Sequence, residues 1–140
     1  MNASYKEFHK KMIIEWTTKS LQAPPFANVT TDEKQSNDLQ EDDPQNSDAL
    51  YVKRLQQLQA DPTQDHTKDI GQWLITTAVA KYAHLVPLIP RDLFWYFGSD
   101  CMHFLGDEEI TSFQHLDEEF YSADQECNYF ELRSKLLGLH

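Results

Sequence analysis

The sequence predicts an all-α protein, a compact bundle of about five to six helices with an acidic flexible loop after the first helix. Apolar residues recur at helical spacing in several separate segments, and no pair of strands is evident. The length of 140 residues fits one domain of ordinary size. A domain of this size can bury a core without a metal or a disulfide.

The first predicted element is an amphipathic helix within residues 1–27. Ser4 and Glu7 have the spacing of a capping box, in which each side chain accepts the other's free backbone N–H. We expect the helix to end before Pro24, because the residue before a proline is disfavoured in the helical conformation. The apolar stripe of this helix is formed by Tyr5, Phe8, Met12 and Trp16.

Residues 28–48 form a polar, acidic segment. Val29 and Leu39 are its only sizeable apolar residues, so burial cannot offset the entropy lost on ordering. We therefore expect an acidic flexible linker between the first helix and a main helical domain at residues 49–140. Such a segment is either a solvated spacer or an acidic lure for a basic partner.

The main domain is expected to start with two helices. The first begins at Ser47 or Asp48 and ends at Pro62. The second begins near Thr67, includes Leu85, and is apolar over most of its circumference. A helix of that kind is normally central in a bundle.

The most aromatic segment, LFWYF at 93–97, is long enough to be a strand. We expect a helix instead, because the apolar pattern continues as far as Leu105 and no pairing strand is evident. Asp92 suits the positive end of the helix dipole, and Gly98 is a point at which the helix can bend. Gly106 is a natural C-terminal stop.

A fifth helix is predicted to follow, with Asp107 as its N-cap. Its apolar positions are Ile110, Phe113, Leu116 and Phe120. Its other face is acidic, with Glu108, Glu109, Asp117, Glu118 and Glu119. A last helix is expected to begin near Asp124 and to include Cys127, Phe130 and Leu137.

Charge restricts the functions that are plausible. The formal net charge is −11, and no Lys or Arg occurs from residue 92 to residue 132. This disfavours direct nucleic-acid binding and anionic membrane surfaces, and it favours a protein partner with a basic surface. Cys101 and Cys127 are expected to be reduced, buried thiols in a cytoplasmic protein, and no apolar run approaches a membrane span.

The leading functional hypothesis is a small acidic interaction module that regulates or escorts a basic protein. In one version of this hypothesis, the module mimics the charge of a nucleic acid. Trp95, Tyr96 and Phe97 would form an aromatic anchor if part of the run is exposed. The same rings would otherwise belong to the core or line an apolar pocket. The partner-binding charges would be Glu108, Glu109, Asp117, Glu118 and Glu119.

Two alternatives remain open. One is a metal-binding bundle enzyme or sensor that uses His103, Asp107, His115 and Glu119, although the Glu-x-x-His spacing of di-iron bundles is absent. The other is a structural subunit or homodimer built through Trp95 and its neighbours. No nucleophile, phosphate-binding or cofactor motif is present, so the sequence predicts no cofactor and favours a protein that is not an enzyme.

Overall fold

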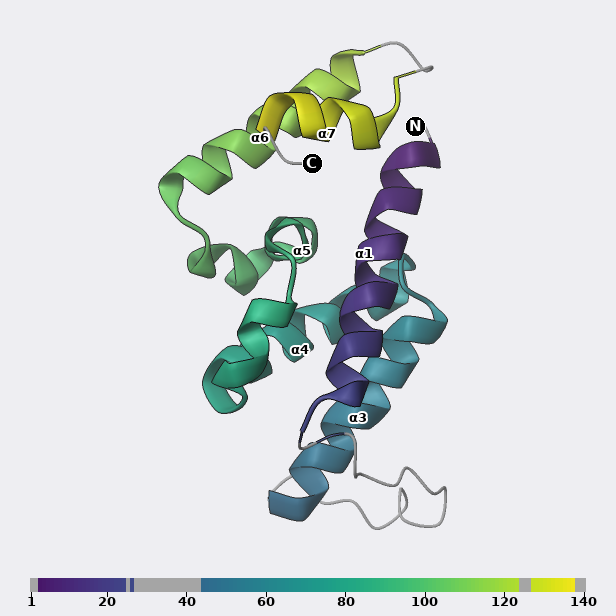
Figure 1. Cartoon of the computed structure of the whole chain (residues 1–140), viewed down its shortest axis with the longest axis vertical. Coiled ribbons are helices and arrows are strands. Elements are labelled where there is room, and N and C mark those ends of the chain that lie inside the picture. The colour runs from purple at the N-terminus through teal and green to yellow at the C-terminus, as the bar shows by residue number, and fades with distance from the viewer. Residues whose placement is uncertain (1–2, 25, 27–43, 124–126, 138–140) are drawn as a thin grey trace.

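A computed structural model describes residues 3–24, 26, 44–123 and 127–137 of the chain. Within these ranges the chain forms six α-helices and three short 3-10 helices, and it contains no strand (Figure 1). The predicted all-α class and helix number are thereby confirmed. Residues 28–43 of the predicted acidic linker lie outside the described residues.

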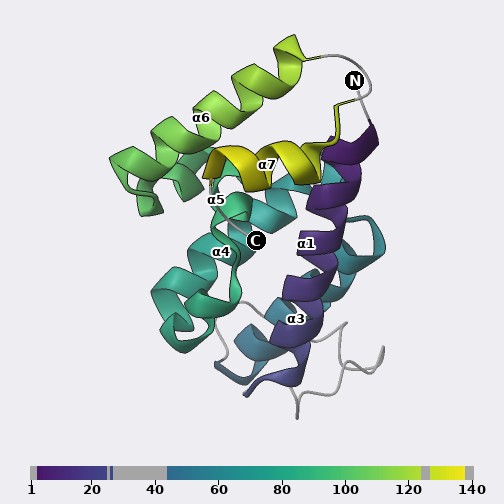
Figure 2. The same ribbon diagram turned by 45° about the horizontal axis from the view of Figure 1, so that its top comes forward.

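Helix α1 (Ala3–Gln22) lies alongside α3 (Pro44–Ala60) in two views (Figures 1 and 2). Ile13 and Trp16 of α1 are almost fully buried in the same hydrophobic cluster as residues of the later helices. The N-terminal helix is therefore part of the main core. Helix α3 begins earlier than predicted, at a proline, which suits the first turn because its missing N–H would have no helical partner.

Ser4 lies inside α1 and not before it, so its predicted place as the N-cap of this helix is wrong. Its hydroxyl oxygen accepts the backbone N–H of Tyr129 over 3.0 Å. Tyr129 is the first residue of α7 (Tyr129–Leu137), whose leading N–H groups have no partner within the helix. Ser4 therefore caps a helix 125 positions away in the sequence.

Helix α4 (Lys68–Lys81) follows a short 3-10 helix, η2 (Asp65–Thr67). Leu74, Ile75 and Ala78 of α4 are fully buried, which matches the predicted central position. The prediction that this helix continues through Leu85 is wrong, because η3 (Ala83–Leu88) replaces its last turns. Pro87 lies inside η3, and its ring and missing N–H do not fit an α-helix interior.

The predicted helix over the aromatic run is also divided. Helix α5 (Arg91–Phe97) ends at Gly98, which has φ 64°, and Ser99 follows with φ 54°. Positive φ values do not fit a right-handed helix, and the first of them is easily adopted by glycine. The chain then continues as η4 (Ser99–Phe104) instead of more α-helix.

Helix α6 (Asp107–Ser122) starts one residue earlier than predicted, because Gly106 and not Asp107 is its N-cap. Helix α7 lies across α6 at one end of the molecule (Figures 1 and 2). The N–H of Gly106 donates to Glu109 Oε1 over 3.0 Å, which fixes the first turn of α6. Helix α7 begins later than predicted, and residues 124–126 lie outside the described residues.

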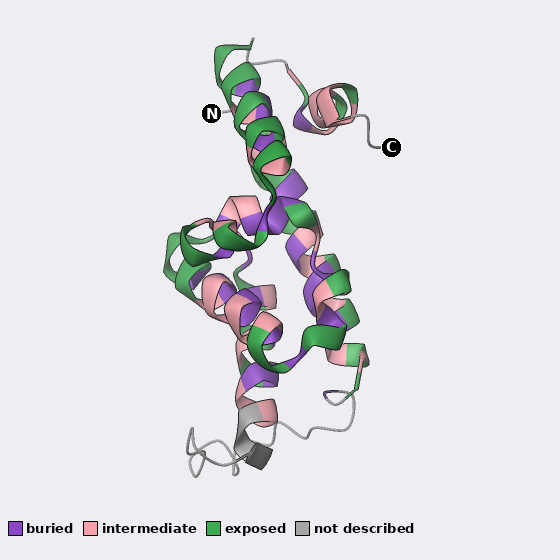
Figure 3. Cartoon of the chain, turned by 90° about the vertical axis from the view of Figure 1, so that its left-hand side faces the viewer, coloured by how far each residue is buried: buried purple, intermediate pink, exposed green. Residues whose placement is uncertain are grey.

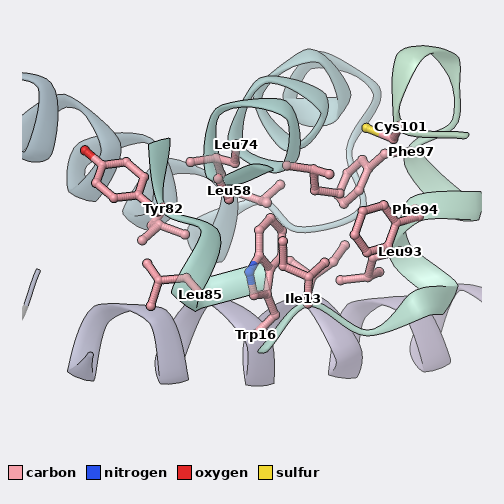
Figure 4. Packing of buried hydrophobic residues seen from close by; sticks show 14 of the residues in the cluster. Ile13, Trp16, Leu58, Leu74, Tyr82, Leu85, Leu93, Phe94, Phe97 and Cys101 are labelled. Carbon is pink, nitrogen blue, oxygen red and sulfur yellow. The ribbon is translucent and has the colours of Figure 1, made fainter. Parts of the chain in front are cut away.

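Buried residues line the inner sides of the helices (Figure 3). The main cluster unites α1, α3, α4 and α5, and Trp16, Leu74 and Phe94 point into it (Figure 4). A smaller cluster joins α1 to α6 and α7 through Phe8, Leu116, Phe120 and Tyr129. None of the described helices combines the length and apolar character required to cross a membrane.

Candidate functional site

Trp95 of the predicted aromatic anchor is half-buried between α5 and α6. Its indole Nε1 donates to Asp117 Oδ2 over 2.8 Å, and its ring stacks on Phe113 with centroids 6.2 Å apart. Burial raises the pKa of Asp117, and the bond from Trp95 opposes this shift. Two of the predicted partner-binding residues therefore bind each other.

The other two predicted anchor rings are also held inside the chain. Tyr96 stacks on His9 of α1, with centroids 4.4 Å apart and 20° between the ring planes. Phe97 is 2% exposed, and its ring lies against the backbone of Gly71. The large hydrophobic side chains that the structure leaves exposed in its described part are Phe104 and Tyr121.

Glu109 is bound by Arg91, the first residue of α5. Arg91 donates to its carboxylate from Nε and from Nη2, both over 2.7 Å. The Arg91 Nη2 group also donates to the carbonyl of Phe104 over 3.0 Å. The bonds from Arg91 to Glu109, and then the bond from the N–H of Gly106, lower the pKa of Glu109 to about 2. Glu109 thus fixes the turn between η4 and α6.

Glu108, Glu118 and Glu119 are the remaining acids of the predicted partner-binding set, and all three are exposed. Glu118 accepts a surface hydrogen bond from Gln114 over 3.2 Å. At 100° per residue, Glu108 and Glu119 share one line along α6, and Glu118 lies about a quarter of the circumference away from it. We call these three side chains the acidic face of α6.

The predicted metal ligands are all exposed. His103 is in η4, whereas Asp107, His115 and Glu119 are spread along α6. Among the residues that the structure describes, no group of three or more His, Cys, Asp or Glu side chains is placed so that it could hold a metal ion.

Sequence reasoning missed a buried polar cluster between α1, α5 and α7. Asp92, which was assigned only to the dipole of α5, binds Arg133 of α7 through both oxygens, over 2.6 and 2.7 Å. His9 is 1% exposed and lies among aromatic rings. The available signal was the place of Arg133, the first cation after the long acidic segment.

A groove of about 480 Å³ opens beside this cluster, between α1, α5, α6 and α7. Its apolar lining is Met12, Pro90, Phe113 and Leu137. Both arginine ion pairs line it as well, and α6 adds Glu108 and Ser112 at the border with the acidic face. The groove was not predicted, because it arises where four elements meet.

Comparison with known proteins identifies the family. Residues 18–139 match the family described as PA2817-like, which is most of the chain. The chain belongs to the PA2817-like family. No curated protein and no solved structure matches it.

The PA2817-like region contains the acidic face of α6, both arginine ion pairs and nearly all of the groove lining. Its match begins at Thr18, inside α1, so that Met12 and His9 lie outside it. The first turns of α1 nevertheless complete the fold, because Ile13 and Trp16 are buried in the main core. The PA2817-like description names no activity.

Proposed function

We propose that the protein is a small acidic helical interaction module that regulates or escorts a basic protein, with the acidic face of α6 as its contact surface. The observation that carries the proposal is the division of labour among the acids. Asp92 of α5 and Glu109 and Asp117 of α6 have intramolecular partners. Glu108 and Glu119, in contrast, lie exposed along one side of α6.

The charge distribution supports a basic partner. The segment from 92 to 132 holds eleven acidic residues and no Lys or Arg, so it accounts for the whole formal charge of −11. A surface of one sign speeds encounter with the opposite sign and rejects like charges. Along α6, Glu108 and Glu119 are separated by a rise of about 16 Å. This row of charge would also suit a partner that normally binds nucleic acid.

A cytoplasmic location is part of the same proposal. Cys101 is buried as expected, whereas Cys127 is only half-buried. Burial raises the pKa of the Cys101 thiol to about 11. Such a thiol is unreactive and stays protonated at neutral pH. This supports a protein whose stability does not depend on an oxidising compartment.

The test reverses charge on the contact surface. A Glu118→Lys, Glu119→Lys variant and the wild type would be used as bait in lysate, with captured proteins identified by mass spectrometry. A Glu7→Lys, Glu15→Lys variant is the matched control, because it makes the same charge change at exposed positions of α1. Each bait would be washed at about 0.05 M and about 0.5 M salt, which span strong and weak screening.

We expect the wild type and the α1 control to retain one dominant basic protein at low salt and to lose it at high salt. The α6 variant should bind that protein roughly tenfold more weakly, since exposed charge pairs contribute up to about 1 kcal/mol each. A dominant partner that is acidic, or one that binds the α6 variant as tightly as the wild type, would refute the proposed function.

A further inference from the structure

We propose that the groove beside the acidic face of α6 receives the apolar side of a basic amphipathic helix. This inference rests on the proposed function and specifies the partner: a helix with apolar side chains on one face and Lys or Arg beside them. One partner helix would contact the groove and the acidic face together, because Glu108 belongs to both.

The apolar half of the argument is the lining of the groove. Phe113 forms part of it and is 5% exposed, while Met12 and Leu137 are only half-buried. A volume of about 480 Å³ lies within the usual range of binding pockets, roughly 300–1,000 Å³. Most of the binding energy of an interface comes from apolar side chains that enter such a cleft and are removed from water.

The charged half of the argument depends on which lining charges are already neutralised. Arg133 is paired with Asp92, and Arg91 is paired with Glu109, each through two hydrogen bonds. Of the described lining charges, this leaves Glu108 without an ion-pair partner. The groove therefore presents a net negative border, and an anionic ligand would find both guanidinium groups occupied.

The shape of the groove favours a helix as the bound partner segment. The groove lies between helices, and an amphipathic helix commonly binds by placing anchors spaced three or four residues apart into a cleft of this kind. Basic residues that flank those anchors would then lie over α6. There they would meet Glu108 first and Glu119 further along the same line of the helix.

The probe is a fluorescent peptide of about 14 residues, roughly four helical turns, made only of Leu and Lys. One version places Leu on a single helical face. An isomer with the same composition distributes Leu around the helix. Because their composition is the same, the two peptides carry equal charge and differ only in the apolar face. Their binding to the full-length protein would be measured by fluorescence anisotropy.

Two protein variants separate the groove from the charge. Ser112→Trp places a large ring at an exposed residue that lines the groove. Thr111→Trp is the matched control, because Thr111 is the exposed neighbour on α6 and does not line the groove. Circular dichroism would confirm that both variants keep the helical content of the wild type.

We expect the amphipathic peptide to bind at least about tenfold more tightly than its isomer, which corresponds to about 1.4 kcal/mol. Ser112→Trp should remove this preference, and Thr111→Trp should keep it. Equal binding of the two peptides, or an unchanged preference in Ser112→Trp, would overturn the inference about the groove while leaving the acidic face as a contact surface. Failure of both peptides to bind would also overturn it, and the charge-reversal capture would then decide the proposed function separately.

Discussion

Arg133 of α7 donates to both carboxylate oxygens of Asp92 in α5, from Nε over 2.6 Å and from Nη2 over 2.7 Å. The two side chains are only 15% and 4% exposed. The guanidinium carbon also lies 5.0 Å from the centre of the Phe8 ring in α1. One buried ion pair therefore connects three helices that are far apart in the sequence.

Removing one partner of this pair should destabilise the fold strongly. In Arg133→Ala, the Asp92 carboxylate would remain buried without its cation, and such a loss costs about 3–5 kcal/mol. Urea unfolding followed by circular dichroism gives the change in free energy from the midpoint and slope. A loss below about 1 kcal/mol would mean that the pair is far more solvated than its burial indicates.

The double variant Asp92→Leu, Arg133→Met is the control for that prediction. Replacing a buried ion pair by apolar side chains of similar size is often nearly neutral. We therefore expect the double variant to be more stable than Arg133→Ala. This order would show that the unpaired buried charge, and not the lost side-chain volume, causes the destabilisation.

Gly71→Ala is expected to destabilise the protein by about 1–3 kcal/mol through overpacking. A Cβ at this position would overlap the Phe97 ring, so α4 and α5 would have to separate. Thermal unfolding measures the effect. The control is Gly106→Ala, where the nearest atom lies 3.6 Å away and the cost should stay within about 1 kcal/mol.

A second background makes the cause of the Gly71 effect specific. In Phe97→Leu the two ring atoms nearest the added methyl group, Cε1 and Cζ, are absent, so the methyl group should cost less there than in the wild type. Equal costs in both backgrounds would place the strain somewhere other than this ring contact.

The sequence predicts well what depends on local periodicity. In α6, the spacing of apolar residues placed Phe113, Leu116 and Phe120 inside and Glu108 outside, as the structure shows. Asp117 was assigned to the acidic outer side, yet it binds Trp95. A residue at the edge of an amphipathic pattern can turn either way, and its tertiary neighbour decides.

Contacts between distant segments were not predictable from one sequence. Asp92 and Arg133 are 41 residues apart, and neither has a pattern that identifies the other. The bend at Gly98 was foreseen, because glycine permits a positive φ. The positive φ of Ser99, the first residue of η4, has no such local signal.

Glu109→Gln should have a small effect that depends on pH. The pKa of Glu109 is lowered from 4.5 to about 2, first by the hydrogen bond from Arg91 and then by the Gly106 N–H. A lowered folded-state pKa stabilises above the unfolded value, and this contribution disappears as pH falls from about 4.5 to about 2. Because the pair is solvent-exposed, we expect no more than about 1 kcal/mol.

The measurement for Glu109 compares unfolding free energies at several pH values. The difference between wild type and Glu109→Gln should shrink as the solution becomes more acidic. Glu108→Gln is the matched control, one position away on the same helix and exposed. If both variants lost stability equally, the ion pair with Arg91 would have no special role.

His9 should make the fold less stable in mild acid. Its pKa is lowered from 6.5 to about 4, chiefly because the ring is buried, while the Tyr5 carbonyl and Asp92 oppose the shift and Arg133 and Lys68 add to it. The ring Nδ1 lies 2.8 Å from that carbonyl and must be the donor, since a carbonyl only accepts. Because burial disfavours the charged ring, neutral His9 with its proton on Nδ1 is the form that fits the fold.

The sign of the pH effect follows from that pKa. Between pH 6.5 and about 4 the unfolded chain binds a proton at His9 and the folded chain does not. The folded state therefore becomes less stable as the pH is lowered through this window. The full effect approaches roughly 3 kcal/mol, at about 1.4 kcal/mol per pKa unit. Above pH 6.5 the contribution of His9 is constant.

The test compares the slope of unfolding free energy against pH in the wild type and in His9→Gln. The glutamine cannot titrate, so the fall between pH 6.5 and 4 should be reduced even if the variant is less stable at neutral pH. His115→Gln, at an exposed position of α6, should retain the wild-type slope. An unchanged slope in His9→Gln would show that the acid sensitivity arises from groups other than this buried ring.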